Sequence, residues 1–315
     1  MLIFIVIIVF ILFILALLAI VGNYFYTIAL RPGKLAALMK SEDQQAAFHA
    51  DSIEDKAKNW WDNMPVNVIS ITSNDGLLLH GYHIINENPT NRLVILVHGY
   101  YGEASEMAVY AKIYYEMGFD IFAPDNRGHG KSEGNAIGMG WLDRLDCLQW
   151  IEFLTVLKGG QIEILLHGHS MGGAIVSILS GEKILPNIKG IISDCAYDSV
   201  KNIFTYQIKK MFKLPAFPII PVASLICKLR AGYFFGEADV TRQVACSKVP
   251  ILYIHGSQDD FVPCKMVYNL YDATDPKLRK IWVVDGAKHI ESIKKEPDKY
   301  ADHIRFFVEQ IFEKK

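Results

Sequence analysis

The most regular pattern along the chain is an unbroken hydrophobic run over residues 2–21. A helix of this length crosses the roughly 30 Å hydrocarbon core of a bilayer. The run is followed by N-Y-F-Y at residues 23–26, an aromatic set that suits the membrane–water interface. A cleaved signal peptide fits less well, because no basic segment precedes the run and no small-residue cleavage site follows it. We therefore expect an uncleaved, single-pass transmembrane anchor over residues 1–25, and with it a location in the cell membrane.

After the anchor the hydrophobic pattern becomes mixed. Residues 26–63 are alanine-rich, carry charges of both signs and favour helix, so we interpret them as a juxtamembrane stalk. Residues 64–315 then form one domain of ordinary size. It opens with two apolar segments, residues 66–72 and 77–84, that flank the turn sequence N-D-G and predict an antiparallel pair of strands.

Further along the domain, short continuous apolar runs alternate with segments of helical spacing. Such runs are typical of strands buried on both faces of a parallel sheet. They lie at residues 94–97, 120–123, 161–166, 190–193, 251–254 and 281–284. Residues 105–117 and 141–154 have helical spacing, whereas residues 197–249 interrupt the alternation with amphipathic, proline-containing pieces. The pattern predicts an α/β fold: a mainly parallel central sheet covered by helices, with a small cap insertion at 197–249 and an N-terminal transmembrane helix.

One glycine-rich turn stands out among the loops. Residues 168–172 read G-H-S-M-G, which fits the G-x-S-x-G pattern of a nucleophile elbow. A serine on a sharp strand-to-helix turn sits in a strained backbone conformation, so the positions two before and two after it must be small. The turn leaves Ser170 at the N-terminus of a helix, where backbone N–H groups and the helix dipole favour an oxyanion.

A carboxylate and a histidine follow later predicted strands, each just past the carboxyl end of its strand. A serine hydroxyl needs a base to take its proton, and histidine has a suitable pKa. Of ten histidines, His289 is the one late in the chain on a loop after the last predicted strand. For the acid that orients it, Asp259 and Asp260 are adjacent, and the spacing G-x-x-D-x-x-V-P selects Asp259. Asp194, after an earlier predicted strand, stays open as an alternative acid.

From residue 66 to residue 312 the chain resembles the α/β-hydrolase superfamily, and within it the serine esterases, lipases and prolyl-oligopeptidase-like hydrolases. The motifs that carry the resemblance are H-G-Y-Y-G, D-N-R-G-H-G-K-S, G-H-S-M-G, H-G-S-Q-D-D-F-V-P and G-A-K-H. The resemblance implies Ser170 as nucleophile, His289 as general base and then acid, and Asp259 as the orienting carboxylate. It also implies an oxyanion hole formed by the backbone N–H groups of Tyr100 and Met171. The family leaves the substrate open, because the fold carries many chemistries.

The composition of the chain limits the kinds of binding partner that we expect. The net charge of −2 and the lack of a basic cluster argue against nucleic acid. Five cysteines without C-x-x-C spacing indicate neither a disulfide framework nor a metal site, and we expect no cofactor. D-N-R-G-H-G-K-S at 125–132 lacks phosphate-loop spacing, so we interpret it as a tight structural loop in which Asp125 and Arg127 make backbone or ion-pair contacts.

These observations predict a serine hydrolase that cleaves carboxylic esters with a hydrophobic acyl portion. The partners would be a small-molecule ester or acyl substrate and, through the N-terminal helix, the membrane. A serine peptidase of the prolyl-oligopeptidase type is the alternative, although the residues before 66 are too few for a propeller domain. A non-catalytic binding protein is disfavoured because every catalytic position is filled. Arg31, Lys34 and Lys40 follow the anchor and weakly favour a cytoplasmic domain, which leaves the side of the membrane open.

Overall fold

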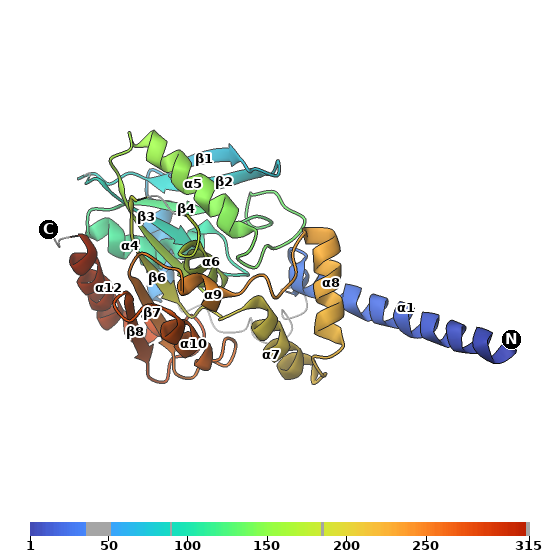
Figure 1. Ribbon diagram of the computed structural model, residues 1–315. Helices are drawn as coiled ribbons and strands as arrows, with labels where there is room; N and C mark the ends of the chain where they lie inside the picture. Colours follow the sequence, from blue (N-terminus) through green and yellow to red (C-terminus); the bar gives the residue numbers. More distant parts are fainter. Residues whose placement is uncertain (36–51, 89, 184–185, 313–315) are drawn as a thin grey trace.

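The computed structural model describes residues 1–35, 52–88, 90–183 and 186–312, and shows a rounded body from which one long helix projects (Figure 1). This helix, α1 (Leu2–Leu30), is the one described helix that is long and apolar enough to cross a membrane. It continues past the expected anchor 1–25 as far as Leu30. Of the expected stalk 26–63, residues 36–51, Lys40 among them, lie outside the described residues. Its last part contains the short helix α3 (Ile53–Asp62), which is capped by the Ser52 side chain.

The centre of the body is an eight-stranded sheet with the order β1-β2-β4-β3-β5-β6-β7-β8. The first three strands along the sheet are antiparallel neighbours, and all pairs from β4 to β8 are parallel. The strands are β1 (Asn67–Thr72), β2 (Leu78–Ile84), β3 (Arg92–Val97), β4 (Asp120–Pro124), β5 (Glu163–His169), β6 (Ile188–Asp194), β7 (Ile251–Gly256) and β8 (Arg279–Val284). The expected fold class, a mainly parallel sheet that opens with an antiparallel pair, is confirmed.

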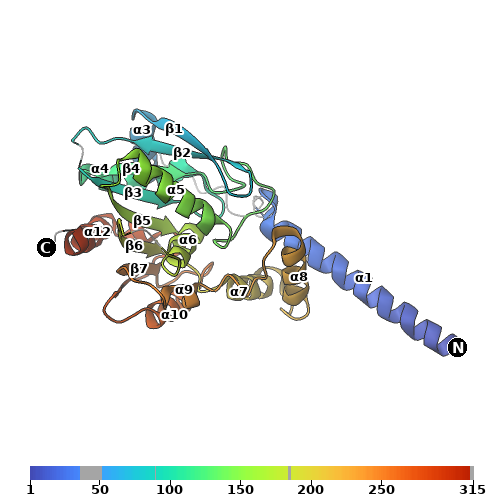
Figure 2. The ribbon, with the colours of Figure 1, turned by 45° about the horizontal axis from the view of Figure 1, so that its top comes forward.

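Helices cover both faces of this sheet (Figures 1 and 2). One hydrophobic core lies beneath α3, α4 (Ala108–Glu116), α11 (Ser292–Lys295) and α12 (Pro297–Phe312). The other lies beneath α5 (Asp143–Leu157), α6 (Met171–Leu179), α9 (Val240–Val244) and α10 (Lys265–Ala273). Strands β3 to β7 are buried on both faces, which explains why their sequences are continuously apolar rather than alternating.

The segment between β6 and β7, where we expect a cap, contributes two helices at the end of the body from which α1 emerges. These are α7 (Val200–Phe212) and α8 (Ile219–Ala231), and Figure 2 shows both beside the base of α1. The C-terminal part of α1 packs against α8, and Tyr26 and Leu30 belong to the same hydrophobic core as the cap. The C-terminal end of α1 is therefore part of the folded body.

Candidate active site

Ser170 lies on a sharp turn between β5 and α6. Its backbone has φ 54° and ψ −120°, a conformation that L-residues rarely adopt. A Cβ on Gly168 would lie 2.2 Å from the Gly172 carbonyl oxygen, and a Cβ on Gly172 would lie 1.9 Å from the Val97 oxygen. Glycine is thus required at both positions for steric reasons, as the G-x-S-x-G pattern predicts.

Three of the predicted side chains form one hydrogen-bonded series at the carboxyl ends of the strands. The Ser170 Oγ lies 2.9 Å from the His289 Nε2, and the His289 Nδ1 lies 2.7 Å from the Asp259 Oδ2. The Asp259 side chain is fully buried, whereas the His289 side chain is 16% exposed and can meet a substrate. Such an arrangement lets the imidazole take the serine proton while the carboxylate holds its tautomer.

The two other candidate acids do not contact His289. Asp260 points outward and pairs with Lys210 of α7 at 2.8 Å. Asp194 is buried behind the elbow, where its Oδ2 accepts a 2.8 Å hydrogen bond from the Tyr300 hydroxyl and its backbone oxygen accepts one from the Ser170 N–H. Burial raises the pKa of Asp194 to about 6, although the Tyr300 hydrogen bond acts in the opposite direction.

Asp259 is held by its own loop and by a second histidine. Its Oδ1 accepts hydrogen bonds from the backbone N–H groups of Phe261 and Val262, at 2.9 and 2.8 Å. The buried His255 Nε2 lies 2.8 Å from the Val262 oxygen and 3.3 Å from the Asp259 carboxylate. Burial alone would raise the pKa of Asp259, but hydrogen bonds with His255 and His289 lower it to about 2. Asp259 is therefore an anion at neutral pH.

The loop after β3, which carries Tyr100, is fixed by three histidine rings. The His98 Nε2 accepts a hydrogen bond from the Asn126 N–H, so its Nδ1 carries the proton and donates to the Gly99 oxygen at 2.7 Å. The His169 Nε2 accepts from the Gly99 N–H at 3.2 Å. The His129 Nε2 lies 2.7 Å from the backbone oxygen of Tyr100. The ring of His98 therefore helps to orient this loop.

The backbone N–H groups of Tyr100 and Met171 are available to a ligand. Within the described part of the chain, neither group donates a hydrogen bond to another protein atom. Met171 begins α6, so its N–H also lies at the positive end of that helix.

The loop 125–132 has the structural role that its sequence indicates. Asp125 accepts hydrogen bonds from the backbone N–H groups of Ala104 and Lys131, both at 2.9 Å. Arg127 forms ion pairs with Asp146 at 2.6 Å and with Asp75 at 2.8 Å. The loop 125–132 therefore packs against the loop that follows β3 and holds it in place. The expectation that Asp125 and Arg127 make backbone or ion-pair contacts is confirmed.

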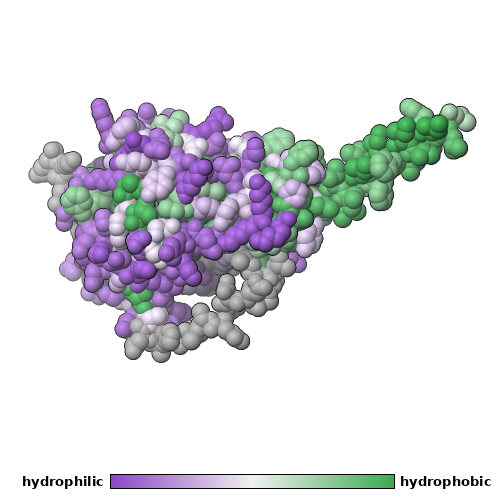
Figure 3. Space-filling model, turned by 90° about the horizontal axis from the view of Figure 1, so that it is seen from below, coloured by the Kyte–Doolittle hydropathy of each residue, from purple (hydrophilic) through white to green (hydrophobic). Residues whose placement is uncertain are grey.

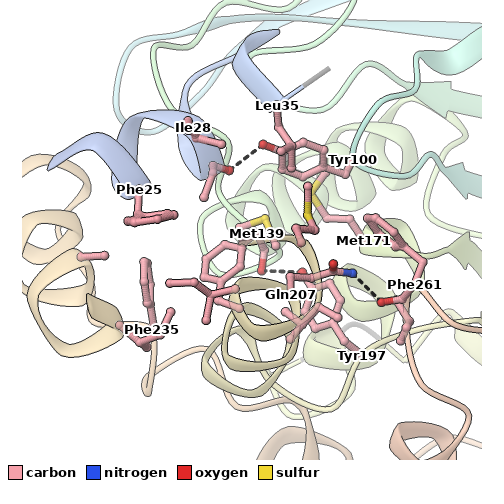
Figure 4. Close-up of a pocket in the computed structure, with 18 of the residues that line it drawn as sticks. Phe25, Ile28, Leu35, Tyr100, Met139, Met171, Tyr197, Gln207, Phe235 and Phe261 are labelled. Carbon is pink, nitrogen blue, oxygen red and sulfur yellow. Dashed lines mark hydrogen bonds between the residues drawn. The ribbon is translucent and has the colours of Figure 1, made fainter. Parts of the chain in front are cut away.

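A deep pocket leads away from Ser170 and is almost entirely apolar. It encloses about 830 Å³ of empty space, part of it open to solvent. Figure 4 shows Met171 and Phe261 at one end and Phe25 and Phe235 at the other. The elements that line it are the elbow, α7, α8 and the last turns of α1. The contribution of α1 could not be predicted from the sequence, because nothing in a uniformly apolar segment indicates that it also lines a pocket.

One group of described residues could offer three ligand atoms to a metal ion: Cys195, Asp259 and His289. Two of them are already hydrogen-bonded to each other, and His289 is also bonded to Ser170. Burial raises the pKa of the Cys195 thiol well above its usual value, which disfavours the thiolate that a metal would need. The donor set therefore suits proton transfer better than metal binding.

Comparison with known proteins identifies a family, several relatives and a solved structure to which this chain is similar. The sequence profile of a family described as "Serine aminopeptidase, S33" matches residues 88–231. Among curated proteins, YqkD of Bacillus subtilis is 24% identical over 80% of this chain and 82% of its own length. The membrane protein YNL320W of Saccharomyces cerevisiae is 24% identical over 85% and 87%. The Pyrococcus furiosus esterase Pf2001 superimposes with a TM-score of 0.64 at 22% identity, over 79% of this chain and 93% of the esterase.

The sheet order, the strained elbow and these likenesses define the class: in fold, the chain is an α/β hydrolase. It combines this fold with an N-terminal helix long and apolar enough to span a membrane.

Proposed function

We propose that the protein is a membrane-anchored serine hydrolase that cleaves carboxylic esters with a hydrophobic acyl portion. The observation that carries the proposal is the Ser170–His289–Asp259 series, which opens directly into an apolar pocket. The likeness to an esterase of the same fold supports ester cleavage. The apolar α1 and the likeness to a yeast membrane protein support a place in the cell membrane.

In the proposed reaction, the Ser170 Oγ attacks the ester carbonyl carbon while the His289 Nε2 takes the hydroxyl proton. The backbone N–H groups of Tyr100 and Met171 donate to the oxygen that becomes negative. His289 then gives its proton to the leaving alkoxide, which departs as the alcohol and leaves an acyl group on Ser170. A water molecule, deprotonated by His289, hydrolyses that acyl-enzyme to the free acid. Asp259, an anion at neutral pH, stabilises the imidazolium in both halves.

A serine peptidase is the second candidate, and the aminopeptidase description of the matching family favours it. An aminopeptidase must hold the charged α-amino group of its substrate, for which a carboxylate is the suitable partner. No aspartate or glutamate is among the described residues that line the pocket. An uncharged acyl chain is therefore the better fit to these walls.

The test combines a covalent probe with a substrate panel. A fluorophosphonate should label the wild-type protein and not Ser170→Ala, and this variant should lose about 10⁴-fold or more in kcat. p-Nitrophenyl esters should be cleaved and peptide anilides should not. Labelling that survives in Ser170→Ala would refute the nucleophile, and cleavage of the anilides alone would favour the peptidase.

A further inference from the structure

The helix α1 divides into two parts that have different surroundings. Nearly every side chain of residues 2–20 is exposed, whereas from Val21 onward most are half-buried or buried against the body. Residues 2–20 extend about 28 Å at the usual helical rise, which matches the hydrocarbon core of a bilayer. The surface of the membrane therefore lies near Val21, at the level where α8 contacts α1.

The second part of α1 is attached to the catalytic body by specific contacts. The Tyr100 hydroxyl donates a 2.6 Å hydrogen bond to the Ala29 oxygen, and the Ile137 N–H donates one of 2.7 Å to the Leu30 oxygen. A Cβ on Gly22 would lie 2.5 Å from the Val222 Cγ1, so α1 and α8 approach closely there. Tyr100 thus joins the proposed oxyanion hole directly to the membrane helix.

On its outer side α8 carries a hydrophobic stripe that no described element covers. Phe217 is 77% exposed, and Leu225 and Leu229 are 50% and 78% exposed. Within the helix, Leu225 and Leu229 and the exposed Pro221 are spaced four residues apart and share one side, and Phe217 lies just before the helix begins. Figure 3 shows that the hydrophobic surface of α1 continues onto the part of the body from which the helix emerges.

The charge of the cap fits an anionic lipid surface. Residues 199–236 contain no aspartate or glutamate, and they carry six basic residues: Lys201, Lys209, Lys210, Lys213, Lys228 and Arg230. Two of these form ion pairs with carboxylates outside the segment, Lys210 with Asp260 and Lys228 with Glu237. The protein as a whole has a net charge of −2, so this segment differs sharply from the rest. Arg230 lies over the Tyr26 ring of α1, 5.3 Å from its centre, and this places a cation at the level expected for lipid headgroups.

We propose that α8 lies in the membrane surface with Phe217, Leu225 and Leu229 among the lipid acyl chains, and that the pocket takes single-chain esters directly from that leaflet. Phe25 and Ile28 of α1 and Ile220 and Ala223 of α8 line the pocket, and Figure 4 shows Phe25 at the end away from Met171. An acyl chain that enters the pocket from the bilayer, beside these residues of α1 and α8, thus stays in apolar surroundings as far as the nucleophile. The substrate part of this inference rests on the proposed esterase activity.

The experiment uses the full chain in vesicles of phosphatidylcholine and phosphatidylglycerol. Two substrates with the same leaving group are compared: p-nitrophenyl palmitate within the bilayer and p-nitrophenyl butyrate in the water. In the variant Phe217→Ser/Leu225→Ser/Leu229→Ser, palmitate hydrolysis should fall about tenfold while butyrate hydrolysis changes by less than about twofold. The matched control is Val156→Ser/Leu157→Ser/Phe306→Ser, three exposed hydrophobic residues on α5 and α12, and it should leave both rates unchanged.

A second measurement locates α8 independently of activity. In a Cys246→Ser/Cys264→Ser background, a fluorophore on Leu229→Cys should be quenched by spin-labelled lipids, and one on Val156→Cys should not. Equal quenching at both positions, or unchanged palmitate hydrolysis in the stripe variant, would overturn the proposal. If the wild type cleaves neither ester while Leu229 is quenched, the proposed function fails but the position of α8 in the membrane stands.

Discussion

At one end of the pocket, around Ser170, polar groups are held in place by hydrogen bonds from loops that follow the strands. At the other end, hydrophobic side chains of α1, α7 and α8 meet by packing alone; the Phe25 and Phe212 rings, for example, lie edge to face with centres 5.1 Å apart. Catalysis at the polar end depends on the relative positions of the reacting groups to within tenths of an ångström. Binding at the apolar end depends on the volume and shape of the pocket. Substitutions at the two ends should therefore change different quantities: the rate of the chemical step at one, and the preference among acyl chains at the other.

At the polar end, after loss of the nucleophile itself, the largest effect should come from Asp259. In Asp259→Asn, an uncharged amide replaces the carboxylate that accepts the hydrogen bond from the His289 Nδ1, and the amide favours the wrong tautomer of the imidazole. The value of kcat should therefore fall by about 10³–10⁴. Asp260→Asn removes only a surface pair with Lys210, and kcat should change less than about twofold. Steady-state kinetics on p-nitrophenyl butyrate measure both. A severe loss in Asp260→Asn with little change in Asp259→Asn would contradict the assignment of the acid.

A smaller effect concerns the buried Asp194 behind the elbow. Burial raises its pKa to about 6, compared with about 3.9 in the unfolded chain, so the folded protein binds more protons between these pH values. The free energy of unfolding should therefore decrease as the pH rises from 4 to 7, by about 2 kcal/mol from this group. Asp194→Asn can still accept the Tyr300 hydrogen bond but does not ionise.

Urea unfolding at several pH values measures this difference. Relative to the wild type, Asp194→Asn should become more stable by about 2 kcal/mol between pH 4 and pH 7. If the stability difference between the two proteins is the same at every pH, Asp194 does not titrate as its burial implies.

Most of the polar end could be predicted from the sequence, because each of its parts is a short motif with a local cause. The glycines two residues before and after Ser170 are required by close backbone contacts at the turn, and Asp259 and His289 follow apolar runs that form the neighbouring parallel strands β7 and β8. The neighbours that orient them could not be predicted in the same way. His255 appears in the sequence only as a residue at the end of a strand, and its contact with Asp259 depends on how the following loop returns.

The apolar end of the pocket could be predicted from the sequence only in part. The cap could be located from the break in alternation, but periodicity does not say which side of an amphipathic helix faces a pocket and which faces lipid. The second role of α1 follows from a contact between segments far apart in the chain, such as the hydrogen bond from Tyr100 to Ala29. A uniformly hydrophobic sequence carries no signal for such a contact.

The central claim is that Ser170 cleaves an ester whose acyl chain lies between α1 and the cap, and the dependence of kcat/KM on acyl length tests it most directly. Each buried CH₂ group contributes about 0.8 kcal/mol, so wild-type kcat/KM should rise from p-nitrophenyl acetate to butyrate to octanoate. Phe25→Ala should lower the octanoate-to-butyrate ratio about tenfold with butyrate nearly unchanged, whereas the control Tyr24→Ala, an exposed neighbour on α1, should not. A wild-type kcat/KM that falls steadily from acetate to octanoate would contradict the account.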